Sequence, residues 1–309
     1  MASPVPESGI VSPAIPRVEP PYGTIVQELR SGMAIPFLGA AASRVGMQPG
    51  DPAYLPSGKD LAEILASDSR FPSQDERDRG DLGKVSSYYV GGSTRGALRR
   101  KLRGVFVNEA YRFNELHRLI AQLANNLFIV TTNYDTLLEQ AFQAQNKKYD
   151  LVVYPADNDD YANAVLWWPH GADEPEKVRP NQFEMESLAG TNVIYKIHGS
   201  VRPDASTWDG FVITEEDYIR FLSRMKNAVP SSIRRYFAER AFLFLGYGLN
   251  DWNMRVLLNE VSVPGITSWA ILNNPSLFEE TLWKRRKVDI FHLDLEEFVA
   301  TMRTQAGLL

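Results

Sequence analysis

Cysteine is absent from all 309 residues of the sequence. Without a thiol the chain forms no disulfide, carries no cysteine nucleophile and binds no zinc or iron–sulfur centre through cysteine. Long hydrophobic runs are also absent, because no apolar stretch approaches the roughly 18 residues that a membrane-spanning helix needs. The first residues lack the basic start and apolar core of a signal peptide. We therefore expect a cytoplasmic protein with no membrane partner.

An excess of positive charge is missing as well, since 33 Lys and Arg stand against 38 Asp and Glu, a net charge of -5. This balance gives no reason to expect the whole surface to bind nucleic acid. The contents of 44% hydrophobic and 23% charged residues are ordinary for a soluble globular protein. The length allows one large α/β domain with insertions or two smaller domains. Local motifs must therefore indicate the chemistry.

Apolar strand-like runs alternate with amphipathic helix-like segments along most of the chain. Strands are expected at 33–38, 127–130, 151–154, 193–197, 211–213, 241–245, 268–272 and 288–291. Helices are expected at 22–31, 114–124, 134–142, 214–225, 232–240, 252–261 and 293–302. This alternation predicts an α/β fold with a doubly wound, Rossmann-like parallel sheet. Pro36 argues against a central position for the first strand, because proline lacks a ladder donor.

Three segments interrupt the alternation. Residues 1–22 contain six prolines and are expected to form an extended lead-in to a domain spanning 23–309. Residues 47–112 or so carry three expected helices, at 59–66, 81–90 and 94–106, and predict a helical insertion that forms a smaller subdomain or lid. Residues from about 155 to 190 are polar and proline-dotted, which predicts an irregular surface excursion.

Some side chains in these segments have two interpretations each. Arg95, Arg99 and Arg103 recur every four residues, as expected for a solvated helix face or for contact with an anion or partner. Trp167 and Trp168 either fill a small satellite core or contact a substrate or partner. His117, at the apolar face of helix 114–124, is interpreted as structural rather than catalytic.

The stretch LFIVTTNYD, at residues 127–135, is the most informative one for locating a site. Its apolar half predicts a strand buried on both faces, as parallel sheets have. Thr131, Asn133 and Asp135 then fall at the turn into a helix. Because ligands of open α/β sheets bind at the carboxyl ends of strands, this turn predicts a site. The alternative is that Asn133 and Asp135 only cap the helix.

Three other expected strands end in residues that suit a site, at 39–43, 198–199 and 246–251. In a parallel sheet all four ends meet at one edge. The small residues at 39–43 let backbone N–H groups approach an anion, and a helix starting there would add positive potential; tight strand–helix packing is the alternative. His198 has the alternative of a satisfied turn histidine, and Gly246 and Gly248 that of turn geometry alone. Asp251 is interpreted as a helix cap.

Taken together, these motifs resemble the sirtuin-like NAD-binding domains, in particular the zinc-free branch of prokaryotic antiphage defence proteins. The matching segments are FLGAAAS at 37–43, LPSG at 55–58, TTNYD at 131–135, KIHG at 196–199 and FLGYG at 244–248. Their order and spacing agree over residues 33 to about 255. One departure is Ala41, which stands where the family's Gly-Ala-Gly-x-Ser motif has its second glycine and which would crowd a pyrophosphate.

The resemblance implies NAD as the substrate, no zinc, and a role for each motif. Asn133 and Asp135 would surround the nicotinamide, and His198 would contact the ribose beside the scissile bond, so these three are the candidate catalytic residues. The candidate NAD-binding residues are Gly39, Ala40 and Ser43 along the phosphate and ribose, Gly246 and Gly248 at the adenosine half, and Thr131, Thr132 and Gly199 in the same motifs.

The activity implied by the resemblance is an NAD glycohydrolase that releases nicotinamide and ADP-ribose and depletes NAD in antiphage, abortive-infection defence. Cleavage builds positive charge on the ribose, which nearby acceptors stabilise. Asn133 can orient the carboxamide or the attacking water, and His198 can accept a ribose hydroxyl proton. A non-catalytic NAD- or ADP-ribose-sensing module stays open, and so does a protein deacylase, which the missing zinc module disfavours. The resemblance also implies a homo-oligomer and a partner such as a nucleic-acid-translocating ATPase or an Argonaute-like protein.

Overall fold

A computed structural model describes residues 18–123, 126–156, 161, 164–184, 190–248 and 265–308. Within these ranges nine strands form one sheet, in the order β11-β10-β9-β1-β2-β6-β3-β4-β5. Their bounds are β1 Ala34–Leu38, β2 Phe128–Thr131, β3 Tyr149–Val153, β4 Val165–Trp168, β5 Glu176–Val178, β6 Asn192–Lys196, β9 Ala241–Leu245, β10 Ser268–Leu272 and β11 Val288–His292. From β11 to β3 neighbouring strands are parallel. The predicted doubly wound α/β fold is confirmed.

Helices cover both faces of the sheet because the strands are apolar on both sides. One face packs against α1 Tyr22–Arg30, α6 Glu115–Gln122, α7 Leu137–Ala144 and α12 Leu295–Gln305. The other face packs against α8 Glu215–Ala228, α9 Ser231–Glu239 and α11 Leu277–Lys284. None of the described helices is long and apolar enough to cross a membrane. The predicted helix 252–261 and Asp251 lie outside the described residues.

The expectation that Pro36 disfavours a central strand is wrong. Strand β1 lies between β9 and β2, and all five of its residues are buried. Leu38 O accepts the Thr132 N–H on the β2 side, and backbone groups two residues apart point to the same neighbour, so the Pro36 nitrogen faces β2 as well. The ladder with β2 starts only at Phe37↔Val130. The Pro36 nitrogen offers no donor there, and β1 keeps its central place through the ladder with β9, which runs along all five of its residues.

The expectation of an irregular excursion at 155–190 is wrong in part. Strands β4 and β5 continue the sheet beyond β3 as two antiparallel strands. In β4, Leu166 and Trp168 join the core on one face of the sheet, and Val165 joins the core on the other, with Trp167 packed against it. The two tryptophans therefore have core roles, and Trp167 Nε1 also donates to Asp150 Oδ2 at 2.9 Å. The strand expected at 211–213 is instead the short β8, Gly210–Phe211, paired antiparallel with β7, Gly199–Ser200.

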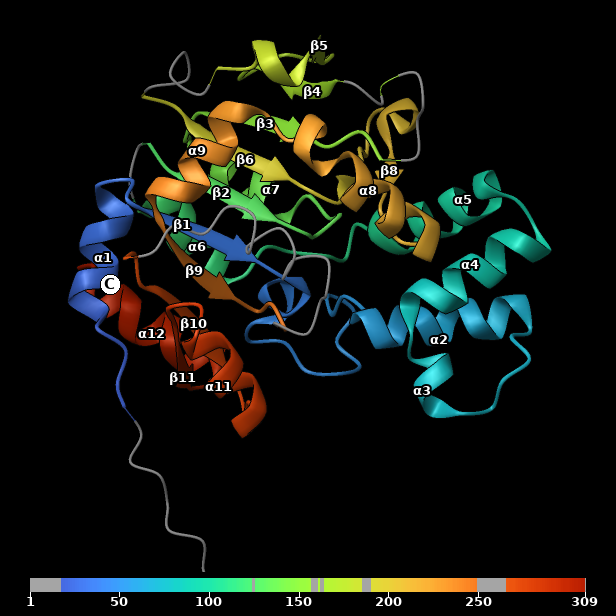
Figure 1. The fold of residues 1–309 in the computed structure, drawn as a ribbon, viewed down its shortest axis with the longest axis horizontal. Helices are drawn as coiled ribbons and strands as arrows, with labels where there is room; N and C mark the ends of the chain where they lie inside the picture. Colours follow the sequence, from blue (N-terminus) through green and yellow to red (C-terminus); the bar gives the residue numbers. More distant parts are fainter. Residues whose placement is uncertain are drawn as a thin grey trace, which may run out of the picture.

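A group of helices stands beside the sheet and has its own apolar core (Figure 1). These helices are α2 Gly58–Ser69, α3 Glu76–Arg79, α4 Leu82–Gly92 and α5 Arg95–Phe106, which we call the helical subdomain. Their core includes Leu65, Val85 and Leu102, and it is joined by Tyr134 and Phe211 from the sheet side. The subdomain is thereby packed onto the ends of the strands rather than onto a sheet face.

The α6 helix begins with a capping arrangement built on a buried histidine. The Nδ1 of His117 accepts the Asn114 N–H at 3.3 Å, and Asn114 Nδ2 donates to the carbonyl of Ala42 at 2.8 Å. Burial lowers the pKa of His117 to about 4, and the negative charge of Glu139 opposes this only in part. His117 is therefore neutral and structural, as the sequence indicated.

We predict that His117 makes the fold sensitive to mild acid. Between about pH 6.5 and pH 4, His117 binds a proton in the unfolded chain but stays neutral in the folded chain. The contribution of neutral His117 to the free energy of unfolding is complete above pH 6.5. It is lost as the pH falls from there to about 4, at up to about 1.4 kcal/mol per pH unit. Urea unfolding at pH 7.5, 6.0 and 5.0 should give a shallower decline for His117→Gln than for the wild type. His292→Gln, a change at a partly exposed histidine, is the control, and equal declines in all three proteins would contradict the prediction.

Candidate active site

A cleft of about 690 Å³ lies between the carboxyl edge of the sheet and the helical subdomain. The loops after β1, β2 and β6 form one wall and Tyr218 of α8 adds to it, while the start of the subdomain and the end of α5 form the other. The lining residues are Ala40, Ser43, Leu55, Pro56, Ser57, Gly58, Leu61, Leu82, Phe106, Thr132, Asn133, Tyr134, Asp135, His198 and Tyr218.

The cleft gathers most of the polar side chains that the sequence singled out. Among the predicted site residues, Ala40, Ser43, Thr132, Asn133, Asp135 and His198 line it. The others, Gly39, Thr131, Gly199, Gly246 and Gly248, do not belong to its lining. The amide at 133 and the imidazole at 198 thus border one cavity, although they are 65 positions apart in the sequence.

The side chain of Asn133 is held in one orientation. Its Nδ2 donates to the Gly39 carbonyl at 3.0 Å and to Ser43 Oγ at 3.0 Å. Because a backbone carbonyl only accepts, the contact with Gly39 fixes which end of the amide faces β1. None of the described hydrogen bonds uses the other end, Oδ1. The amide therefore presents a fixed acceptor that a ligand or a water molecule can use.

Both carboxylate oxygens of Asp135 are engaged by the chain itself. Oδ2 accepts the Ser43 hydroxyl at 2.9 Å, and Oδ1 accepts the Leu137 N–H at the start of α7 at 3.0 Å. The capping alternative therefore describes Asp135 in part, but not Asn133. Burial, together with the negative charge of Asp135, raises the pKa of Tyr111 nearby. Asp135 thus fixes Ser43, and through it Asn133, at the edge of the cleft.

His198 is oriented by aromatic packing. Its ring lies edge-on to Tyr218, with centroids 5.7 Å apart, and to Phe221, with centroids 5.6 Å apart. Both partners come from α8, three residues apart and hence on one helix face. The imidazole is 4% exposed and its position is fixed by these contacts. Sequence reasoning missed Tyr218, although the spacing of two aromatic residues in an expected helix was visible.

Glycines bring two loops into backbone contact behind the cleft. A Cβ on Gly246, whose φ is +66°, would lie 2.2 Å from the Ala42 nitrogen, and a Cβ on Gly39 would lie 2.5 Å from the Gly246 carbonyl oxygen. The Ala41 N–H donates to that oxygen at 3.0 Å. These positions fit the packing alternative, and a contact of Gly39 or Gly246 with NAD stays a prediction. The segment after Gly39 is a 3₁₀ helix, η1 Ala40–Arg44, too short to add a long helix's positive potential.

Two arginines of α5 attach the subdomain next to His198. Arg95 Nη1 pairs with Asp217 Oδ2 at 2.8 Å, and Arg103 Nη1 pairs with Asp209 Oδ2 at 2.9 Å. Arg95 also donates to the Phe211 carbonyl at 2.6 Å. For these two side chains the interpretation as a solvated helix face is wrong, because both pair with the segment from 209 to 217. The far wall of the cleft is therefore fixed to the β7–β8 hairpin.

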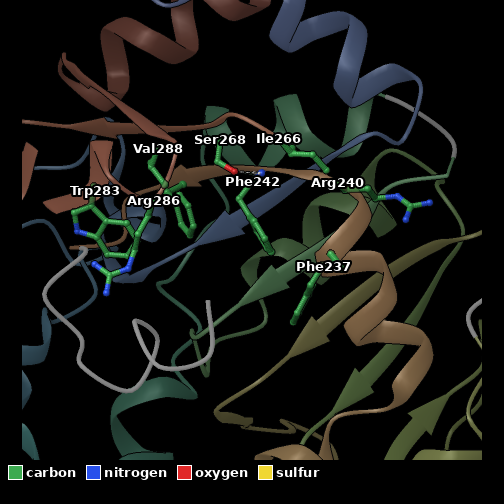
Figure 2. A pocket seen from close by; sticks show the side chains of 10 residues that line it. Phe237, Arg240, Phe242, Ile266, Ser268, Trp283, Arg286 and Val288 are labelled. Carbon is green, nitrogen blue, oxygen red and sulfur yellow. Dashed lines mark hydrogen bonds between the residues drawn. The ribbon is translucent and has the colours of Figure 1, made fainter. Parts of the chain in front are cut away.

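A second cavity, of about 430 Å³, lies beside the first residues of β10 and β11 and contains none of the predicted site residues. Figure 2 shows Trp283 and Arg286 together at one side of it and Arg240 at the other. The hydroxyl of Ser268, which lines it, already accepts the Phe242 N–H at 2.9 Å. This cavity is lined mostly by aromatic and aliphatic side chains. The cleft at the carboxyl edge is the candidate active site because it gathers six of the predicted site residues. No cluster of three or more histidine and carboxylate side chains suited to a metal occurs among the described residues.

Known proteins are similar to this chain in sequence. The sequence profile of the SIR2-like domain family matches residues 127–291, more than half of the chain. A protein of Acinetobacter baumannii named NAD(+) hydrolase ThsA is 25% identical over 242 residues, 77% of this chain and 41% of that protein. A protein of Enterococcus faecium, also named NAD(+) hydrolase ThsA, is 25% identical over 64% of this chain and 36% of that protein. Defense-associated sirtuin 2 of Bacillus subtilis is 24% identical over 48% of this chain and 12% of that protein. The chain thus spans less than half the length of these relatives.

We predict that the backbone contact at Gly246 is indispensable to the fold. Gly246→Ala places a methyl group against Ala42 at a positive φ, and it should lower the free energy of unfolding by about 2 kcal/mol or more. Gly248→Ala is the matched control, since no described atom lies within 4 Å of a Cβ there, and it should change stability by about 0.5 kcal/mol or less. Urea unfolding measures both. An equal decrease in the free energy of unfolding in the two variants would contradict the prediction that the fold depends on the backbone contact at Gly246.

Proposed function

The chain belongs to the SIR2-like domain family, and from this premise we propose that it is an NAD glycohydrolase, which uses water to split NAD into nicotinamide and ADP-ribose. The observation that carries the proposal is that Asn133 and His198 line the same cleft. The names of the relatives, NAD(+) hydrolase, support the same reaction.

The fixed groups of the cleft suit cleavage of the nicotinamide–ribose bond. The transition state places positive charge on the ribose, so acceptors that are already oriented lower its energy. Asn133 Oδ1 is such an acceptor, because contacts with Gly39 and Ser43 hold its amide. In this role it orients the attacking water or the carboxamide. His198 accepts a proton from a ribose hydroxyl, which further stabilises the developing charge.

The charge of the cleft favours the nicotinamide half of NAD. Its described lining contains no lysine or arginine, and Asp135 is its acidic side chain. This arrangement suits the cationic nicotinamide ring better than the anionic pyrophosphate. Leu61, Leu82 and Phe106 form an apolar wall that excludes water around the ring. We therefore assign the cleft to the nicotinamide riboside part, with Asp135 acting as a charge beside it.

We propose further that the reaction serves antiphage defence by depleting NAD. The support is that one relative carries the name Defense-associated sirtuin 2 and that others are named NAD(+) hydrolase ThsA. A homo-oligomeric state and a partner such as a nucleic-acid-translocating ATPase or an Argonaute-like protein stay predictions from the sequence resemblance.

We predict that purified protein incubated with NAD releases nicotinamide and ADP-ribose in equal amounts, as measured by mass spectrometry. Asn133→Ala and His198→Ala should each lower turnover about 100-fold or more, because each removes a group that acts in the transition state. His170→Ala, at a histidine outside the cleft, should keep full activity.

The same assay separates the other functions. Thermal melting of each variant first establishes that it is folded. NAD binding without release of nicotinamide would favour the sensing module, and nicotinamide release that requires an acylated peptide would favour a deacylase. Full activity in folded Asn133→Ala or His198→Ala would reject the site.

A further inference from the structure

Lys196 is a charged side chain with no exposed surface in the middle of the sheet. It is the last residue of β6, which lies between β2 and β3, and its relative exposure is 0%. An ammonium group so placed is stable only with strong hydrogen-bonding partners. The partners of Lys196 therefore indicate which part of the structure it serves.

All described partners of the Lys196 ammonium belong to the turn and helix after β2. Nζ donates to the backbone carbonyls of Tyr134, at 3.3 Å, and of Asp135. It also donates to Glu139 Oε1 at 2.8 Å, on the first turn of α7. Glu139 is 4% exposed, so the ion pair is buried on both sides. One side chain thus binds a strand end, a turn and a helix together.

The contacts of Lys196 lie directly next to the turn that lines the cleft. The ladder between β2 and β6 ends at the pair Thr131↔Lys196, followed by one further bond from Ile197 N–H to Thr131 O at 3.0 Å. Beyond that point the turn that carries Asn133 leaves the sheet. Tyr134 O is held additionally by the Val201 N–H at 3.0 Å, whereas the Asp135 carbonyl is held by Lys196 among the described contacts.

We propose that Lys196 is a positioning residue that sets the distance between Asn133 and His198. Lys196 ends β6 two residues before His198, which lies in the turn that follows. Its ammonium group binds the carbonyls of the two residues that directly follow Asn133. Asn133 and His198, which line the cleft, are therefore both connected to Lys196, which does not line the cleft. The consequence for catalysis depends on the proposed function, whereas the consequence for the order of the turn does not.

A merely structural ion pair would behave differently. If Lys196 only stabilised the packing of α7 on the sheet, its loss would reduce the amount of folded protein and leave the folded molecules fully active. A positioning role predicts folded molecules with a low kcat and a KM that changes little, because about 1 Å of misplacement costs about 100-fold in rate.

The test uses the double variant Lys196→Met with Glu139→Gln, which removes both buried charges so that neither is left unpaired. Hydrogen exchange followed by mass spectrometry should show amides 132–137 exchanging about 10-fold or more faster than in the wild type, while β2 and β6 keep their protection. With NAD as the substrate, kcat should fall about 100-fold and KM should change less than about 3-fold. The matched control is Ile194→Ala, a fully buried change in the same strand, which should destabilise the protein without this local effect.

The single variant Glu139→Gln lowers overall stability because it leaves the Lys196 charge without its carboxylate. It keeps the two carbonyl contacts and an amide oxygen for Nζ, so in folded molecules it should retain the protection of 132–137 relative to β2 and β6 and most of the turnover. Faster exchange there in Glu139→Gln would overturn the assignment to Lys196, even if the double variant did not fold. Unchanged exchange in a folded double variant, or an unchanged kcat, would overturn it too. If the wild type does not cleave NAD, the proposed function fails, and the exchange data still decide whether Lys196 orders the turn.

Discussion

The close approach of two backbones, at Gly39 and at Gly246, is the constraint on which the candidate site depends. Without a side chain at either position, the segment after β1 lies directly against the end of β9. That placement carries Ser43 to the turn after β2, where its hydroxyl contacts both Asn133 and Asp135. The polar groups of the cleft are thus fixed by a contact that takes place behind it.

The other groups of the site are fixed by contacts from different directions. Lys196 binds the turn after β2 from the neighbouring strand, and α8 holds the His198 ring through two aromatic side chains. Arg95 and Arg103 attach the subdomain wall to the segment after His198. Each of these anchors is buried or partly buried and uses a partner from a distant part of the sequence. The result is a preorganised site, in which Ser43, Asp135 and the Nδ2 of Asn133 are hydrogen-bonded within the chain. The Oδ1 of Asn133 is left for a ligand.

The sequence predicted the parts of the fold that depend on local pattern. Long apolar runs such as 127–130 and 241–245 were recognisable as strands, because strands covered on both faces have no polar alternation. Strand β4 was missed because four apolar residues inside a polar segment resemble a loop cluster as much as a strand. Asn133 and His198 could be predicted from motifs at strand ends. The roles of Phe106 and Lys196 could not, since they depend on which distant elements meet. For Tyr218 the aromatic spacing marked a helix face, but not that this face packs against His198.

The two ends of the sheet limit how copies of this chain can associate. At one end β5 has three residues, with Glu176 and Lys177 exposed, and at the other β11 exposes Asp289. Short, charged border strands oppose pairing with a strand of another molecule. A continuous sheet running through several copies of this chain is therefore disfavoured.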